Sequence, residues 1–395
     1  MEICDFSILK DKNVLVISGS EIDKTRIFVK LNLMQLYGSY IVTDPNGILI
    51  EDTGDIFLKS QYDIKIFNLK DTRFSMKYNP FLYIKTELDI LSFVNSLMEN
   101  TKDKRGELGR DFWINAEKIY LQALIGYMME TQSLDNQNIE QLLKYINIGK
   151  TADDEVEQRI DRMFEKLNKV TKGNSFAVRQ YQKFKQVVGN SLRSILISVS
   201  DRMSVFDTKE IRTLLSEDEL NLDSLYKKDT VFFIIIDDTD YSLTFLASIL
   251  YTQLMLILVN SIDRLPNYKF ERPIQFILNN FENTGKIPNF ETFLTTIRSR
   301  NISVIPILQS EEKLEAMYQQ KSEIIKDSCY CSLFIGSKAT HTTKNLIEEL
   351  GKPSVEYKIQ KELEKHKRDD QIVNNDSFKK FNVEEYLKQN ITKKS

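Results

Sequence analysis

Residues 231–236, VFFIII, constrain the fold of this chain most strongly, because six consecutive β-prone apolar residues suit a strand covered on both faces. Similar apolar runs recur along the chain, and stretches with helical spacing separate them. This alternation indicates βαβ units and therefore a mostly parallel sheet with helices on both faces. The predicted strands are 14–17, 40–43, 64–68, 231–236, 274–278, 304–308 and 331–335.

Strand signals stop between residues 87 and 203, where helical periods take over. The predicted helices there are 89–99, 112–130, 139–145, 154–170, 176–188 and 192–199. We therefore expect an all-helical insertion at 87–203 within an α/β domain formed by 1–86 and 204–355. Residues 356–395 are charged and poor in aromatic residues, so we expect a loosely ordered tail. Outside the insertion, the spacing predicts helices at 27–36, 48–60, 290–300 and 312–319.

Composition excludes several classes of protein. The chain is 42% hydrophobic and 28% charged with a net charge of -3, so it is neither disordered nor strongly basic. Any contact with nucleic acid must come from local patches. Three cysteines (Cys4, Cys329, Cys331) and two histidines (His341, His366) are too few and scattered for a disulfide framework or zinc site, so we expect a reducing, cytosolic compartment. Cys329 and Cys331 are predicted to be buried thiols.

One uncharged stretch, residues 241–262, invites comparison with a membrane-spanning helix. Seven polar residues recur in it, however, so we predict a buried helix of a large core and no membrane span. These residues are Ser242, Thr244, Ser248, Thr252, Gln253, Asn260 and Ser261.

Residues 14–30, VLVISGSEIDKTRIFVK, follow the order of a phosphate-binding loop: an apolar strand, a short polar loop and a helix. In the pattern G-x-x-x-x-G-K-[ST], the two glycines let backbone N–H groups turn toward the phosphates, but Ser18 and Asp23 occupy those positions here. Two interpretations stay open, a non-functional turn and a working nucleotide site. The candidate nucleotide contacts are Gly19, Ser20, Lys24 and Thr25, with Thr25 as the Mg²⁺ ligand.

The acidic residues that such a site needs are also missing. A carboxylate after a distant strand holds the Mg²⁺ shell, and a Glu orients the attacking water. After residues 274–278 the chain instead carries Asn279 and Asn280, and a neutral carboxamide cannot accept a proton from water. The nearest carboxylate is Glu282. In addition, Glu21 and Asp23 flank Lys24, and one such charge about 5 Å from a phosphate oxygen costs on the order of 3 kcal/mol.

Two further residues have a functional and a structural interpretation. Gln309 follows a predicted strand, where it could sense a γ-phosphate or form a turn. Arg298, near the end of a predicted helix, could reach a neighbouring subunit as an arginine finger or stabilise the helix dipole.

Several stretches together resemble one family, the type IV secretion coupling proteins of conjugation, of the TraG and TraD kind. The resemblance covers residues 12–351 in unbroken order. The stretches are TDPNG (43–47), YNPF (78–81), DFWINAEK (111–118), FKQVVGNSLRSILIS (184–198), DDTDYSLTFLASILYTQL (237–254), GKIPNFETFLTTIRSRNIS (285–303) and LQS (308–310).

This resemblance implies a RecA-like P-loop NTPase fold with an all-α insertion, assembled as a hexameric ring at the inner face of a bacterial membrane. It further implies ATP and Mg²⁺ as cofactors, and single-stranded DNA and a relaxase as partners. Carried over by position, Lys24 and Thr25 match the phosphate and Mg²⁺ residues, Gln309 matches the sensor and Arg298 matches the finger.

Several residues differ from the family pattern, and these differences lead to our hypothesis about activity. Glycines are replaced by Ser18, Glu21 and Asp23, and Asp-Glu is replaced by Asn279 and Asn280. The family's N-terminal membrane helices and its last motor strand are not recognisable. We therefore expect a degenerate, N-terminally truncated coupling protein that is a pseudo-ATPase, membrane-associated only through partners. The alternatives are a weak DNA-stimulated ATPase using Lys24, Thr25 and Glu282, and a nucleotide-independent DNA-binding module.

Overall fold

Seven parallel strands form one sheet in the order β3-β4-β2-β5-β6-β1-β7. The computed structural model describes residues 13–19, 24–101, 110–148, 156–188, 191–262, 264–337 and 339–350. The strands are β1 (Val14–Ser18), β2 (Ser39–Pro45), β3 (Asp63–Asn68), β4 (Thr230–Ile236), β5 (Ile274–Leu278), β6 (Ile302–Leu308) and β7 (Cys331–Gly336). Each strand predicted from the sequence is present, so the expected parallel α/β fold is confirmed.

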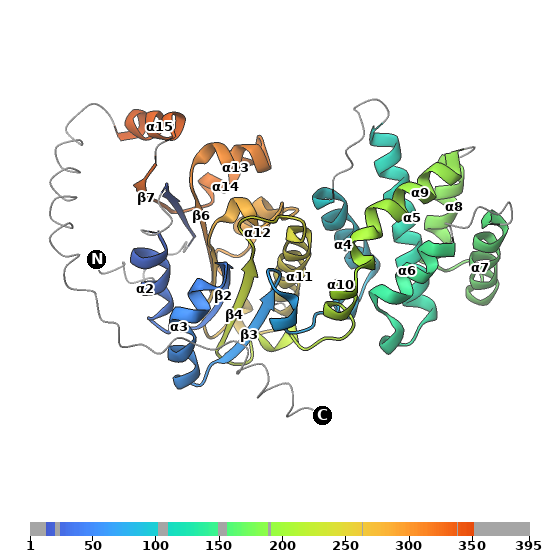
Figure 1. The fold of residues 1–395 in the computed structure, drawn as a ribbon, viewed down its shortest axis with the longest axis horizontal. Helices are drawn as coiled ribbons and strands as arrows, with labels where there is room; N and C mark the ends of the chain where they lie inside the picture. Colours follow the sequence, from blue (N-terminus) through green and yellow to red (C-terminus); the bar gives the residue numbers. More distant parts are fainter. Residues whose placement is uncertain are drawn as a thin grey trace.

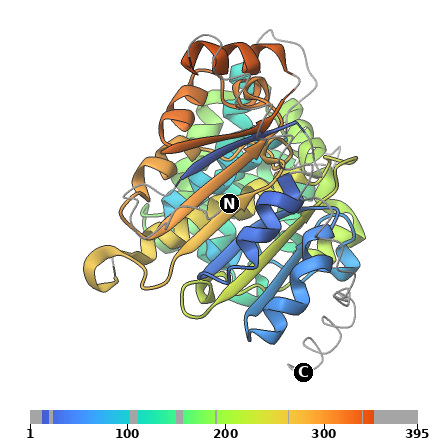
Figure 2. The ribbon, with the colours of Figure 1, turned by 90° about the vertical axis from the view of Figure 1, so that its left-hand side faces the viewer.

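Helices cover both faces of the sheet, because alternate strand residues point to opposite sides. In β4, Val231 and Phe233 belong to one apolar core, and Phe232 and Ile234 belong to the other. The first core lies under α2 (Lys30–Leu33) and α3 (Ile48–Lys59). Figure 2 shows these two helices in front of the strands. The helices on the second face are α4 (Glu87–Asn100), α11 (Thr244–Ile262) and α12 (Phe290–Thr296).

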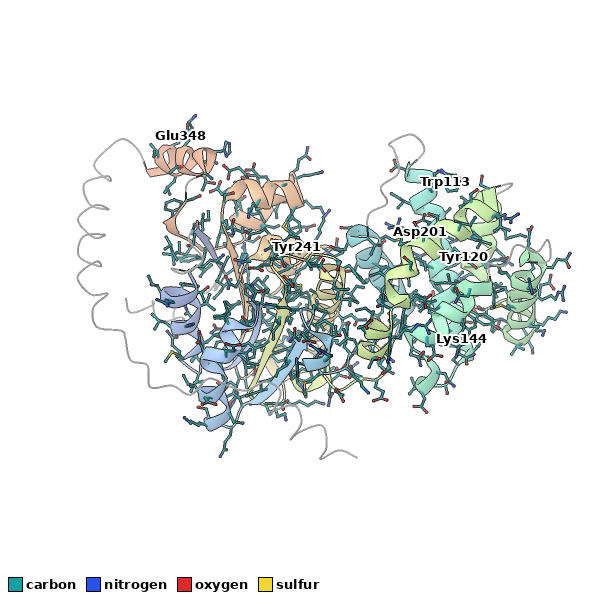
Figure 3. All side chains as sticks on the ribbon, in the orientation of Figure 1. Trp113, Tyr120, Lys144, Asp201, Tyr241 and Glu348 are labelled. Atoms are coloured by element: carbon teal, nitrogen blue, oxygen red, sulfur yellow. The ribbon has the colours of Figure 1, made fainter. Side chains whose placement is uncertain are left out.

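A block of helices lies to one side of the sheet (Figure 1). Its helices are α5 (Arg110–Thr131), α6 (Ile139–Ile148), α7 (Val156–Thr171), α8 (Phe176–Val188) and α9 (Leu192–Arg202). Tyr120 lies inside the block (Figure 3), where its ring stacks on Phe184 with centroids 4.7 Å apart. The helices match the predicted positions to within a few residues. The domain limits at 87–203 stay a prediction.

The uncharged helix α11 is buried as expected. Among the described residues it is the one helix long and apolar enough to cross a membrane, and 72% of its most apolar window is buried inside the protein. Its polar side chains find partners within the core. Ser248 receives a hydrogen bond from Asn100 at 2.9 Å, and Gln253 donates to the Pro80 carbonyl at 2.8 Å.

Two predicted helices are wrong in extent. Instead of one helix at 27–36, a π-helical turn, η1 (Lys24–Val29), leads into α2, which ends at Leu33. Positive φ angles at Leu36 and Gly38 explain the early end, because a helix cannot continue through them. The helix predicted at 290–300 ends at Thr296 as α12, since a turn to Asn301 (φ 60°) leads into β6.

One other local prediction was wrong, and three helices were not predicted. Cys331 is exposed because it begins the edge strand β7, whereas Cys329 is buried as predicted. The sequence did not reveal α10 (Lys209–Leu214), α14 (Lys321–Asp327) or α15 (Thr340–Leu350), while α13 (Glu311–Tyr318) matches the helix predicted at 312–319. The predicted tail at 356–395 lies outside the described residues.

Candidate functional site

The candidate site lies at the edge of the sheet where the strands end, because parallel strands share one carboxyl edge. β6 lies between β1 and β5, and its register pairs Ile17 with Leu308 and Leu278 with Pro306. A candidate residue follows a paired residue on each of the three strands: Ser18 follows Ile17, Gln309 follows Leu308 and Asn279 follows Leu278. The fold therefore brings the phosphate-loop strand, the sensor position and the acidic-residue position to neighbouring strand ends. Ser20, Glu21 and Asp23 lie outside the described residues.

Lys24, at the end of the loop, has a confined side chain. It is fully buried at the start of η1, and its ammonium donates a hydrogen bond to the Oδ1 atom of Asn280. Asn280 has a left-handed backbone (φ 53°) that turns the chain from β5 into η9 (Phe281–Asn283). Thr25 follows and is half-buried. The predicted phosphate lysine therefore contacts the residue at the second acidic position.

Asn279 is buried at the first acidic position, and neither polar atom of its carboxamide has a hydrogen-bond partner among the described residues. By strand alternation it lies on the same sheet face as Ile277, whose core also contains Phe28 and Val29 of η1. The unpartnered amide therefore lies on the face that η1 covers. Burying an unpaired polar side chain costs about 1–3 kcal/mol. We therefore expect Asn279 to form a hydrogen bond with a group that the structure does not contain.

Glu282 and Gln309 are tied together by Lys313, a residue that the sequence analysis missed. The Lys313 ammonium lies 3.0 Å from Glu282 Oε1 and 2.5 Å from Gln309 Oε1. The Glu282 side chain is only 5% exposed, and its other oxygen, Oε2, is buried with no hydrogen-bond partner in the part of the chain that the structure describes. Gln309 lies two residues before α13 and Lys313 lies in its first turn, so no regular helical spacing signalled this contact. The structure thus joins the nearest carboxylate to the predicted sensor through a lysine.

Arg298 is not part of this group. It follows α12 on the way to the start of β6, and therefore belongs to the opposite edge of the sheet. Its side chain is exposed and donates a hydrogen bond to the carbonyl of Asp327, the last residue of α14, at 3.4 Å. A cation at a helix end satisfies carbonyls that have no partner within the helix.

Asp44, at the end of β2, is a second residue that the sequence analysis missed. Its buried carboxyl accepts hydrogen bonds from the backbone N–H groups of Leu49 and Ile50, both at 2.9 Å. Burial raises its pKa to about 7, and the two hydrogen bonds oppose this rise. Residues 43–47 were named only as part of the family resemblance, and the role of Asp44 in holding the start of α3 was not predicted.

These residues fit a nucleotide only in part. Lys24 and Thr25 have the chemistry for phosphate, but the end of β5 offers two carboxamides where Mg²⁺ prefers carboxylate. Among the described residues, no group of three or more His, Cys, Asp or Glu side chains is placed to hold a metal ion. The described residues therefore suit phosphate contact, whereas the end of β5 presents carboxamides where Mg²⁺ prefers carboxylate.

Comparison of the sequence with models of known protein families gives a match to one family. The model of the family described as type IV secretory system conjugative DNA transfer matches residues 4–382. Curated proteins give no match.

Solved structures show the same RecA-like α/β fold. A sulphate complex of the bacterial conjugative coupling protein TrwBdeltaN70 has 14% sequence identity and a TM-score of 0.59, and the match covers 82% of this chain and 70% of that one. The plasmid coupling protein TrwB in complex with ADP and Mg²⁺ has 15% identity and a TM-score of 0.60, with 86% and 74% covered.

Proposed function

The chain belongs to the type IV secretory system conjugative DNA transfer family, and we propose that it is a coupling protein whose nucleotide site does not hydrolyse ATP effectively. Coupling-protein function in conjugative DNA transfer follows from the family. The impaired hydrolysis is inferred from the residues at the candidate site.

The contact between Lys24 and Asn280 is the observation that carries this proposal. In phosphoryl transfer the loop lysine neutralises phosphate charge, and an acidic residue beyond the strand acts on the metal or the water. Here the lysine is bonded to a carboxamide of its own chain. Because a carboxamide carries no charge and accepts no proton, Asn279 and Asn280 cannot supply either acidic role.

The Lys313 contacts support the same proposal. The Lys313 ammonium holds one carboxylate oxygen of Glu282 and the side-chain oxygen of Gln309, so a role of either oxygen at a nucleotide would compete with this contact. We propose that these residues hold the strand ends together rather than act on a nucleotide.

The relative TrwB has been observed with ADP and Mg²⁺. For this chain we propose partners of the same kind as for the family in general: single-stranded DNA, a relaxase and other coupling-protein subunits in a ring. Its place would be the inner face of a bacterial membrane. In such a ring Arg298, exposed and remote from its own site, is the candidate for contact with a neighbouring subunit.

The alternative function is a weak DNA-stimulated ATPase that uses Lys24, Thr25 and Glu282. The Oε2 atom of Glu282 favours it, because that buried oxygen has no hydrogen-bond partner among the described residues and can act as an acceptor.

ATP hydrolysis with single-stranded DNA, compared between the wild type and Lys24→Ala, separates the two functions. We expect equal, background rates, because the wild-type site lacks its acidic residues. A wild-type rate that Lys24→Ala abolishes would instead establish the weak ATPase.

A further inference from the structure

Asn279 carries a complete carboxamide without a partner. Its side chain is 1% exposed, and both Oδ1 and Nδ2 lack a hydrogen-bond partner among the described residues. In the same part of the chain, every other side chain with a buried, unpaired polar atom has just one such atom. Burial without a partner costs free energy, so a ligand that pairs with this carboxamide recovers that cost on binding.

The position of Asn279 is that of a residue facing a bound phosphate. The next residue, Asn280, accepts a hydrogen bond from the ammonium of Lys24, the predicted phosphate lysine. Strand alternation places Asn279 on the sheet face of Ile277, whose core also contains Phe28 of η1. The unpaired carboxamide therefore lies on the face covered by the helical turn that begins with Lys24.

The charges of the candidate group do not call for a metal ion. Glu282 already has a counter-ion, because the Lys313 ammonium lies 3.0 Å from its Oε1 atom. Lys24 adds a second positive charge, and the carboxamides of Asn279 and Asn280 are neutral. A phosphate group therefore meets no carboxylate at the end of β5 from which a metal ion must separate it.

We propose that Asn279 donates a hydrogen bond directly to a phosphate oxygen of a nucleotide bound without Mg²⁺. A carboxylate at this position repels phosphate and needs a metal ion between them, whereas the Nδ2 atom of a carboxamide carries two N–H donors. Hydrogen bonds to a charged acceptor are stronger than neutral ones. The inference rests on the proposed function, because a site that hydrolyses ATP needs the metal ion.

The acidic residues of the loop favour a ligand of low charge. Glu21 and Asp23 flank Lys24 in the sequence and lie outside the described residues. Each negative charge near the phosphates repels free ATP more than free ADP, which carries one charge fewer. A nucleoside diphosphate without metal is therefore the ligand class that this site fits best.

The test is calorimetric titration of the full chain with ADP in EDTA. Asn279→Leu removes both polar atoms at nearly constant volume. We expect this variant to bind ADP at least about tenfold more weakly than the wild type, the effect of losing one hydrogen bond to a charged group. The matched control, Asn115→Leu, changes an exposed residue of α5 in the helical block and should bind ADP as the wild type does.

Asn279→Asp is the second variant, because it keeps the shape of the side chain and exchanges the donor for a negative charge. In EDTA it should also bind ADP at least about tenfold more weakly than the wild type. Mg²⁺ should then tighten binding by this variant about tenfold or more, while changing wild-type affinity by less than about twofold. A misfolded site would gain nothing from Mg²⁺, so this rescue separates the donor role from a loss of structure.

Three results would overturn the inference: no binding of ADP by the wild type in EDTA, unchanged affinity in Asn279→Leu, or an Asn279→Asp variant that does not respond to Mg²⁺. Since ADP binding is measured without hydrolysis, each of these results leaves the proposed loss of hydrolysis in place. Conversely, ATP turnover that Lys24→Ala abolishes would contradict the proposed function and would not alter the measured affinity for ADP.

Discussion

Restoring the acidic residues and glycines of the nucleotide site raises ATP turnover at least about 100-fold over the wild type, the lower range for a positioned acid or base. The variant combines Asn279→Asp, Asn280→Glu, Ser18→Gly, Glu21→Gly and Asp23→Gly. The two carboxylates supply a metal partner and a proton acceptor. The glycines let the loop backbone approach the phosphates, and removing Glu21 and Asp23 removes two repulsive charges.

Substitution of Asn280 also releases Lys24 from its carboxamide partner. Turnover is measured as phosphate release with single-stranded DNA and Mg²⁺, at equal protein concentrations. Adding Lys24→Ala to the restored variant is the control, and it should return the rate to the wild-type value. Comparable turnover in the wild type and the restored variant would show that the replaced residues do not limit hydrolysis.

Arg202→Met lowers the free energy of unfolding by about 3–5 kcal/mol, the usual cost of leaving a buried charge without its partner. Arg202 and Glu117 join α9 to α5, with the Arg202 Nη2 atom 2.7 Å from Glu117 Oε2, and their side chains are 5% and 1% exposed. Arg202 also donates to Thr101 at the end of α4 at 3.1 Å. Its removal leaves the Glu117 carboxylate buried with only the Ser198 hydroxyl as a described donor.

Urea denaturation followed by circular dichroism measures this loss. The matched control is the double variant Glu117→Met with Arg202→Met, in which no uncompensated charge remains. It should recover most of the lost stability, because apolar residues of similar volume often replace a buried ion pair without cost. A double variant as unstable as Arg202→Met would mean that packing, and not charge, accounts for the effect.

The strands and most helices could be predicted from the sequence because their signals are local. The run at 231–236 is apolar at every position, and the alternation of Val231, Phe232 and Phe233 between two cores explains why. The predicted end of a helix was wrong where a single backbone angle decided it, as at Leu36 before Gly38. A propensity pattern gives no sign of such an angle at Leu36, because leucine rarely adopts a positive φ.

The candidate site could be predicted by position but not by contact. The spacing of residues 14–30 identified Lys24, and the end of residues 274–278 identified Asn279 and Asn280. That Lys24 bonds to Asn280 depends on the left-handed turn after β5, and that Lys313 joins Glu282 to Gln309 depends on how α13 follows β6. The Lys24–Asn280 and Lys313–Glu282 contacts link residues 256 and 31 positions apart, so they follow from the assembled sheet and not from a local pattern.

The measurement that tests the central claim most directly is calorimetric titration of the wild-type chain with ATP, with and without Mg²⁺. Because no carboxylate stands at the end of β5, the account predicts that Mg²⁺ changes the affinity for ATP by less than about twofold. Tightening of ATP binding by Mg²⁺ of about tenfold or more, which corresponds to ~1.4 kcal/mol, would contradict it.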